Sequence, residues 1–326
     1  MNLKKIFVSI LMGLTFMQAK GQSVDYSIVS VPEEAGIEFV QITSPTDYVC
    51  MPIVKRNAKG INWLSNRILD VSVDGKNIAY LSFRNNATNI FIKAVDRQGN
   101  SVQRTNRSNV IDFAYSPDGK YISFSEKRGK TNQIFQTNAD NGYVCRQITN
   151  GSQDYSPIYS SDMTQVFFAR QEMKGASIWS YNINNNFLSN YTAGMNPFPL
   201  SDGKSFICTR VTDNGRSEIW KINFETGVEE CIISDLERSF TSPVLSPDKQ
   251  WILFVGSSKI VSGEFSYLNT DIYVARMDGS NFSQITYHAA DDLSPVWSRD
   301  GKYIYFVSQR GNAEGVANVW RMNFIY

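Results

Sequence analysis

The chain has 326 residues, a hydrophobic fraction of 42% and a formal net charge of +1 at neutral pH. Its basic residues are spread along the sequence, so it lacks the cluster of Lys and Arg that marks nucleic-acid or anionic-membrane binding. It has one histidine, His288, which excludes a metal site made of several imidazoles. The length is enough for one large domain with a substantial core.

The N-terminus has the pattern of a secretory signal peptide. Lys4 and Lys5 precede an apolar run over residues 6–17, and the small residues Ala19 and Gly21 follow two positions apart. The run is shorter than the roughly 20 residues that a membrane-spanning helix needs. A buried N-terminal strand or helix is the alternative interpretation.

We therefore expect residues 1–21 to be a signal peptide, residues 22–36 a short N-terminal segment and residues 37–326 the folded domain. No cysteine lies near the expected cleavage point, so a lipoprotein anchor is not indicated. The mature protein is predicted to be periplasmic or secreted and not to span a membrane.

An Asp in a tight turn recurs six times between apolar stretches, with spacings of 44, 44, 40, 46 and 52 residues. The fullest copies read Ser-Pro-Asp-Gly-Lys at residues 116–120 and Ser-Arg-Asp-Gly-Lys at residues 298–302. A second marker follows each copy, namely a polar residue, then Ile or Val, then an aromatic. The turn residues are Asp74, Asp118, Asp162, Asp202, Asp248 and Asp300, and the aromatics are Phe91, Phe135, Trp179, Trp220, Tyr273 and Trp320.

Two markers with the same count and nearly the same period indicate a repeat array. A period of about 40 to 45 residues made of strands is typical of propeller blades. In the copy over residues 110–151, alternating apolar residues lie on both sides of Asp118-Gly119, and two further strand patterns follow. The predicted fold is therefore all-β, a six-bladed β-propeller of four-stranded antiparallel blades.

The last copy lacks its fourth strand, because only three residues follow Asn323. In other copies that strand ends with Gln-Ile-Thr, at residues 147–149 and 284–286, and the same tripeptide occurs at residues 41–43. We expect an N-terminal strand over residues 37–43 to complete the last blade. Such closure removes exposed sheet edges.

Three segments fall outside the repeat. Residues 48–66 are expected to be a long connection into the first blade. Residues 256–269, rich in Ser and Gly, are expected to be a loop insertion in blade five, and residues 310–317 a shorter one in blade six. Long loops on a rigid scaffold are frequent recognition sites, but surface loops also tolerate insertions at little cost. Both interpretations stay open.

The stretch over residues 292–306, which contains Ser-Pro-Val-Trp-Ser-Arg-Asp-Gly-Lys, resembles the repeat of TolB-type six-bladed propellers, and weaker copies lie at residues 154–157 and 241–248. The resemblance covers residues 37–326 and implies the fold and a location in the bacterial envelope. It is limited to the propeller, without the N-terminal α/β domain of TolB, so it does not imply a role in the Tol-Pal system. Peptidase propellers and polysaccharide lyases share the repeat, so no activity is implied.

Known catalytic motifs are missing from the sequence. It has no Gly-x-Ser-x-Gly motif, no phosphate-binding glycine loop and no cluster with metal-ligand spacing. The cysteines follow no metal pattern, and we expect buried free thiols, with a disulfide as the alternative. They are Cys50, Cys145, Cys208 and Cys231.

Polar residues stand where the innermost strands begin, and we expect them to face the central channel. Asp154 and Asp292 come three blades apart and are expected to face each other across it. Such carboxylates could bind a cation such as Ca²⁺ or a basic segment of a partner, or they could simply cap turns. No other cofactor is expected. The residues at the aligned position are Asp112, Ser156, Asn196, Ser242 and Ser294.

His288 lies beside Asp291 and Asp292 in the loop that leads into blade six. A lone histidine in a loop is usually a surface residue, and a functional role at the channel mouth is the alternative. The sequence as a whole favours an exported, monomeric, non-catalytic scaffold that binds a protein partner in the envelope. The alternative is a carbohydrate-active enzyme or glycan-binding propeller, which could use carboxylates of the channel mouth without a histidine.

Overall fold

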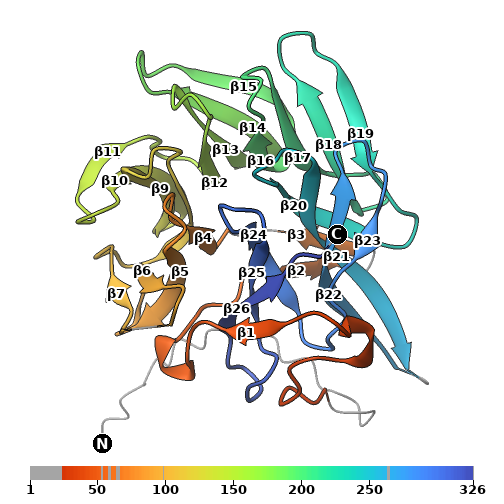
Figure 1. The fold of residues 1–326 in the computed structure, drawn as a ribbon. Coiled ribbons are helices and arrows are strands. Elements are labelled where there is room, and N and C mark those ends of the chain that lie inside the picture. Colours follow the sequence, from red (N-terminus) through yellow and green to blue (C-terminus); the bar gives the residue numbers. More distant parts are fainter. Residues whose placement is uncertain are drawn as a thin grey trace, which may run out of the picture.

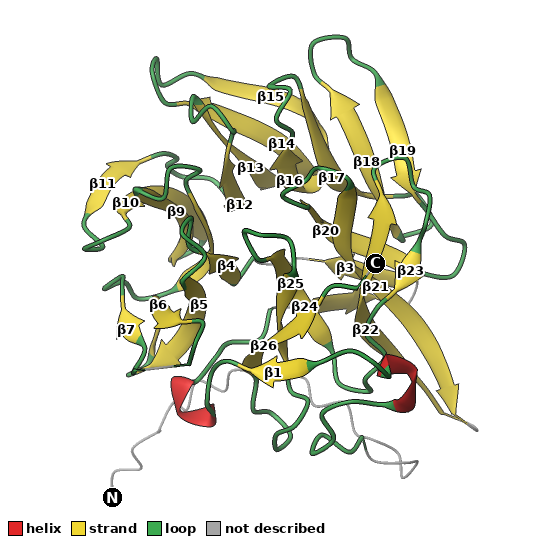
Figure 2. Cartoon of the chain, in the orientation of Figure 1, coloured by secondary structure: helices red, strands yellow, loops and turns green. Residues whose placement is uncertain are grey.

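The computed structural model describes residues 24–52, 54–57, 60–63, 67–97, 99–262 and 265–325. Six four-stranded antiparallel sheets stand around a common centre, which confirms the predicted six-bladed propeller (Figure 1). Two short 3₁₀ turns, Pro32–Glu34 and Pro45–Asp47, flank strand β1 (Figure 2). The predicted signal peptide, residues 1–21, lies outside the described residues.

In the first five blades the strands are hydrogen-bonded in chain order, from the innermost to the outermost. Blade one comprises β4 (Leu69–Val71), β5 (Asn77–Arg84), β6 (Ala87–Ala94) and β7 (Val102–Gln103). Blade two comprises β8 (Val110–Tyr115), β9 (Tyr121–Arg128), β10 (Thr131–Asn138) and β11 (Val144–Gln147). Blade three comprises β12 (Asp154–Tyr159), β13 (Gln165–Glu172), β14 (Gly175–Asn182) and β15 (Leu188–Ala193).

Blade four comprises β16 (Met195–Pro199), β17 (Ser205–Val211), β18 (Ser217–Asn223) and β19 (Glu229–Ile233). Blade five comprises β20 (Ser239–Leu245), β21 (Trp251–Ser262), β22 (Phe265–Arg276) and β23 (Ser283–Gln284). Blade six has three strands from the end of the chain, β24 (Asp292–Trp297), β25 (Tyr303–Ser308) and β26 (Asn318–Asn323). Its fourth strand is β1 (Phe39–Gln41), which pairs antiparallel with β26 and confirms the predicted closure.

A Gln-x-Thr motif fixes the end of the outermost strand in four blades. In each, the threonine hydroxyl accepts a hydrogen bond from a backbone N–H of the third strand at 2.8 to 3.0 Å. In blade six the hydroxyl is that of Thr43 and the donor is the amide of Val319. The borrowed strand therefore ends like the fourth strand of a continuous blade. The four threonines are Thr43, Thr105, Thr149 and Thr286.

The segment after β1 crosses the seam between blade six and blade one. Val49 forms β-bridges to Ser82 of blade one and to Ala317 of blade six. Buried Asp47 forms an ion pair with Arg84 of blade one at 3.3 Å. Residues 47–49 thus join the ring on both sides of the seam.

The turn between the first two strands has the same construction in five blades. In blade two, the Ser116 hydroxyl donates to the Asp118 carboxylate at 2.6 Å, and the carboxylate accepts a second bond from the Lys120 amide at 3.1 Å. Asp and Ser form such local turns readily, which explains the recurring motif in the sequence. The equivalent pairs are Ser72 with Asp74, Ser160 with Asp162, Ser246 with Asp248 and Ser298 with Asp300.

The blades are packed together by large side chains. Between blades three and four, four aromatic rings form a cluster with centroids 5.2 to 6.1 Å apart. Such pairs add to the free energy gained from burying apolar area. The rings are those of Phe167, Tyr191, Phe206 and Phe224.

Two segments outside the repeat contain strands, and the loop expected in blade five was wrong. The connection over residues 48–66 contains a hairpin of β2 (Val54–Asn57) and β3 (Gly60–Trp63), which belongs to no blade and lies against β18 and β20. The insertion in blade five is not a loop, because β21 and β22 stay paired through it as far as Ser262 and Phe265. Ser and Gly weaken a strand pattern in sequence, yet backbone hydrogen bonds alone can continue an existing hairpin.

Glycines in the turn before the outermost strand have different surroundings in different blades. Gly142 of blade two and Gly227 of blade four have φ angles of 75° and 73°. A Cβ atom on Gly142 would lie 1.7 Å from the carbonyl oxygen of Arg104 in blade one, whereas nothing lies within 4 Å of that position at Gly227. Gly142 therefore permits the close approach of two blades.

We predict that Gly142→Ala destabilises the protein more than Gly227→Ala does. Both variants carry the cost of a positive φ, about 1 kcal/mol, and only Gly142→Ala adds the contact with the neighbouring blade. The expected difference in the free energy of unfolding is at least about 2 kcal/mol. Equilibrium denaturation measures it, and equal losses would contradict the close approach.

Candidate functional site

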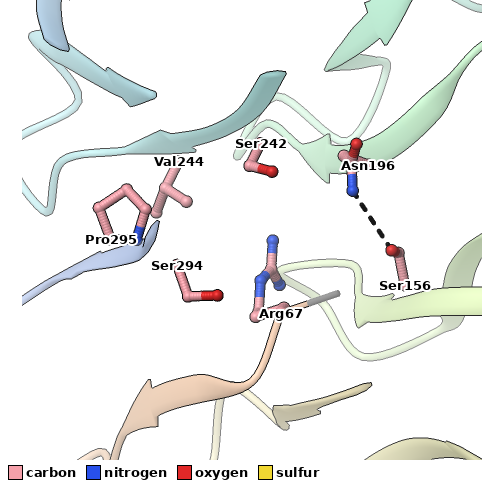
Figure 3. A pocket seen from close by; sticks show the side chains of 7 residues that line it. All are labelled: Arg67, Ser156, Asn196, Ser242, Val244, Ser294 and Pro295. Atoms are coloured by element: carbon pink, nitrogen blue, oxygen red, sulfur yellow. Dashed lines mark hydrogen bonds between the residues drawn. The ribbon is translucent and has the colours of Figure 1, made fainter. Parts of the chain in front are cut away.

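A small cavity lies at the centre of the ring, where four innermost strands begin (Figure 3). About 20 Å³ of it is open to the centre of a water-sized sphere, which is roughly the room of one or two water molecules. The lining residues are Arg67, Ser156, Asn196, Ser242, Val244, Ser294 and Pro295.

Four of these residues have the left-handed backbone conformation, with φ between 50° and 57°. They occupy the same position in blades three to six, and each precedes a proline. The pairing register shifts at this position in every one of the four innermost strands, for example between Tyr155 and Ile158. The bulge turns the side chain toward the channel, as Figure 3 shows. The residues are Ser156, Asn196, Ser242 and Ser294.

Arg67 also lines the cavity, although no motif in the sequence marks it as a site residue. It follows the hairpin of β2 and β3, and its guanidinium lies in the middle of the ring of hydroxyl and amide groups (Figure 3). Its carbonyl oxygen accepts a hydrogen bond from the amide of Phe113 at 3.1 Å, which holds it against blade two. Loss of hydration lowers the pKa of Arg67, although the charges of Asp70 and Asp112 oppose this.

Asp112 does not line the cavity, although it stands at the aligned position in blade two. It is fully buried, and its Oδ2 atom accepts a hydrogen bond from the amide of Ser156 at 2.8 Å. Burial raises its pKa to about 6, in spite of that hydrogen bond. Asp112 therefore links blades two and three from the inside.

Asp154 and Asp292 are both fully buried, and each is paired with an arginine of its own blade. Asp154 accepts two hydrogen bonds from Arg170, at 2.7 and 3.0 Å. Asp292 accepts two from Arg310, of which the shorter is 2.5 Å. Both carboxylates are therefore buried in ion pairs of their own blades, and their predicted role in binding a ligand across the channel stays a prediction.

Arg310 also binds the N-terminal segment. Its guanidinium donates to both carboxylate oxygens of Glu34, at 3.0 and 3.1 Å, and to the carbonyl oxygen of Val29 at 3.0 Å. All three charged side chains, Glu34, Asp292 and Arg310, are excluded from solvent. Breaking such a buried group costs several kcal/mol, because it leaves a charge without its partner.

His288 lies beside this buried group and is itself only 1% exposed, so the expected surface histidine was wrong. Its Nδ1 atom accepts a hydrogen bond from the amide of Ala290 at 2.9 Å. Burial and the charge of Arg310 lower its pKa, which keeps the imidazole neutral at neutral pH. His288 thus packs beneath the N-terminal segment.

Two further carboxyl groups lie near His288. Asp291 accepts hydrogen bonds from both the amide and the hydroxyl of Thr270. Burial, together with Asp292 and Asp291, raises the pKa of Asp271 to about 9, so this carboxyl is protonated at neutral pH. Among the described residues, no group of three or more His, Cys, Asp and Glu side chains is arranged to hold a metal ion.

One arginine in each of five blades lies between a carboxylate and an aromatic ring. In blade three, the Arg170 guanidinium stacks 4.4 Å from the centroid of Trp179 while it binds Asp154. Stacking and ion pairing together fix the guanidinium in place. The other sets are Arg84 with Asp47 and Phe91, Arg128 with Glu126 and Phe135, Arg210 with Glu229 and Trp220, and Arg310 with Asp292 and Phe39.

The rim of the ring where the innermost strands begin, here called the entry rim, carries exposed apolar side chains. Tyr48 and Phe83 are neighbours, since the Phe83 amide donates to the Tyr48 carbonyl at 3.1 Å. Met173 lies on the turn between β13 and β14, and Leu236, 86% exposed, on the loop into blade five. The extended hairpin of β21 and β22 projects from the same rim.

The structure brings together Ser156, Asn196, Ser242 and Ser294, as the sequence predicts, but not the predicted acids. The role of these polar residues and of the acids in binding a ligand stays a prediction.

All four cysteines are free, and the expectation of buried thiols holds for Cys208 and not for Cys145 and Cys231, which are exposed. In the described part of the chain, no helix has the length and apolar character needed to cross a membrane.

Known proteins with a similar sequence support one family. An uncharacterised protein of Agrobacterium fabrum is 32% identical over 121 residues, which make up 37% of this chain and 36% of that relative. The match therefore spans about a third of the curated relative. Residues 57–265 match the family model of the TolB β-propeller domain.

Solved structures of low sequence identity share the fold. TolB of Acinetobacter baumannii gives a TM-score of 0.61 at 17% identity, over 76% of this chain and 64% of that chain. A TolB candidate of Agrobacterium tumefaciens gives 0.60 at 16% identity, over 89% and 98%. Oligogalacturonate lyase of Vibrio parahaemolyticus gives 0.58 at 12% identity, over 91% and 95%. Because the family model covers more than half of the chain, the protein belongs to the TolB β-propeller family.

Proposed function

We propose that this protein is an exported, non-catalytic scaffold that binds a protein partner in the bacterial cell envelope. The signal-peptide pattern over residues 1–21 supports export to the periplasm or beyond. Membership of a propeller family supports a binding role, because such rings gather loops from several blades on one surface. The proposed active form is a monomer.

The apolar side chains on the entry rim carry this proposal. Met173 and Leu236 are almost fully exposed, and Tyr48 with Phe83 forms a second apolar spot. Apolar and aromatic residues of this kind are enriched at the centres of protein interfaces. A glycan-binding site would instead need a groove with open polar groups, and the central cavity is small.

A carbohydrate-active enzyme or glycan-binding propeller is the second candidate. The structural similarity to an oligogalacturonate lyase favours it, although at 12% identity that similarity concerns the fold alone. A glycosidase needs two carboxyl groups that can reach the sugar. Asp154 and Asp292, the acids predicted for this role, are held by Arg170 and Arg310, which argues against their use in catalysis.

Site-specific photo-crosslinking in the producing bacterium tests the first candidate. A photoreactive amino acid at Met173 or Leu236 on the entry rim is expected to give discrete protein adducts in the envelope fraction. Tyr143 and Phe187, exposed on turns at the opposite rim, serve as matched controls and should give few. Equal adducts from both rims, or none from the entry rim, would contradict the proposal.

The variant Asp292→Asn separates the two candidates. It leaves the buried guanidinium of Arg310 with one carboxylate instead of two, so we expect a loss of about 3 kcal/mol in the free energy of unfolding. Asp213→Asn, at an exposed turn, is the control and should change little. If Asp292→Asn instead keeps its stability and abolishes binding or cleavage of oligogalacturonate, the enzyme candidate stands.

A further inference from the structure

We propose that the protein partner at the entry rim is recognised through an acidic segment, which docks on a basic patch over blade two. The basic patch is made of Arg107, Lys127, Arg128 and Lys130, and all of these except Arg107 are exposed. This docking rests on the proposed function, and it adds the charge of the partner's contact segment and the blades that the segment crosses.

The fold gathers the basic patch from two separate stretches of blade two. Arg107 lies in the loop that leads into β8, whereas the other three residues lie at the end of β9 and in the turn to β10. Glu126 joins the two stretches, because its carboxylate pairs with Arg107 at 2.6 Å and with Arg128 at 2.9 Å. Both guanidinium groups also lie over the ring of Phe135, at 5.3 and 4.5 Å from its centroid. The two arginines are therefore held in place before any partner binds.

The lysines of the basic patch carry charge that the surrounding residues do not neutralise. Lys127 and Lys130 are exposed, and neither forms an ion pair within the part of the chain that the structure describes. Glu126 is already shared by the two arginines, so the patch keeps a net positive charge. On the neighbouring turn of blade three, exposed Glu172 is offset by Lys174. The patch is therefore open to an acidic group from outside the chain.

An exposed apolar side chain, that of Met173, adjoins the basic patch on the side of blade three. The carbonyl oxygen of Lys130 accepts a hydrogen bond from the side-chain amide of Gln153. The carbonyl oxygen of Gln153 in turn accepts one from the amide of Gln171 at 2.8 Å. Gln171 lies two positions before Met173, so three residues link the cation to the apolar side chain.

A second apolar side chain, that of Phe83, adjoins the patch on the side of blade one. The amide of Lys127 donates to the carbonyl oxygen of Asn109 at 2.9 Å, and the neighbouring carbonyl of Ser108 accepts from the amide of Thr88 at 3.4 Å. Thr88 is the strand partner of Phe83, which is 48% exposed. A segment that crosses blade two would thus meet cations in its middle and an apolar side chain at each end.

The other half of the entry rim carries exposed acids. Asp213 lies on the turn between β17 and β18, Glu237 in the loop into blade five and Glu314 in the loop between β25 and β26. An acidic segment is attracted to blade two and repelled from this half, which sets how the partner lies on the ring. The apolar side chains at both ends of the patch favour a peptide, because an acidic glycan has no apolar side chains to place against them.

Photo-crosslinking from position 173 in two matched variants tests the docking. The double variant Lys127→Glu with Lys130→Glu is expected to lower the adduct yield roughly 10-fold, because two attractive charges become repulsive. The same change of charge at the opposite rim, Lys120→Glu with Lys204→Glu, should leave the yield unchanged. All four lysines are exposed, so the Tm of both variants should stay that of the wild type, which confirms that each is folded.

Mass spectrometry of the wild-type adduct identifies the partner peptide that lies at position 173. A peptide of net negative charge supports the proposal. A neutral or basic peptide, or an adduct yield that the double variant at residues 127 and 130 leaves unchanged, would overturn it and leave the protein partner in place. The absence of any adduct from the entry rim would instead remove the proposed function itself. Saturable binding of oligogalacturonate to the purified mature chain, lost in that double variant, would assign the patch to an anionic glycan and overturn the acidic segment.

Discussion

The ring depends on one seam, where strand β1, near the start of the chain, serves as the outer strand of the last blade. β1 supplies backbone hydrogen bonds to β26, and Thr43 closes the blade with the same hydroxyl bond that ends three continuous blades. Beyond β1 the segment reaches blade one, where Asp47 pairs with Arg84. An open ring would expose two sheet edges and the apolar faces of two blades, so every other contact in the propeller relies on this closure.

The seam also explains where the charges of the entry rim lie. Arg310 binds Asp292 and Glu34 and so fixes the N-terminal segment, and four other blades also have an arginine between a carboxylate and a ring. These acids therefore serve the fold. For recognition, the described part of the entry rim offers exposed apolar side chains, at Met173 and Leu236.

The sequence allowed the fold to be predicted almost completely, because a repeat leaves the same mark in each blade. The Ser-x-Asp turn and the Gln-x-Thr end each reflect a hydrogen bond that recurs, and so even the closure could be predicted. The candidate site could be predicted less well from the sequence. Nothing in the sequence showed that Arg170 and Arg310 come back to Asp154 and Asp292, since each pair is separated by a strand and a turn. Arg67 carries no motif, and its place at the centre follows from a hairpin that the repeat does not predict.

Hydrogen exchange at the seam tests the central claim most directly. The amide of Val319 donates to the Thr43 hydroxyl in blade six. The amide of Ile134 donates to the Thr149 hydroxyl in blade two, whose four strands are consecutive in the sequence. If the borrowed strand is integral to the ring, both amides should exchange only through global unfolding and with the same protection. An amide of Val319 that exchanges roughly 100-fold faster than that of Ile134 would show that the seam opens by itself, and would contradict the account.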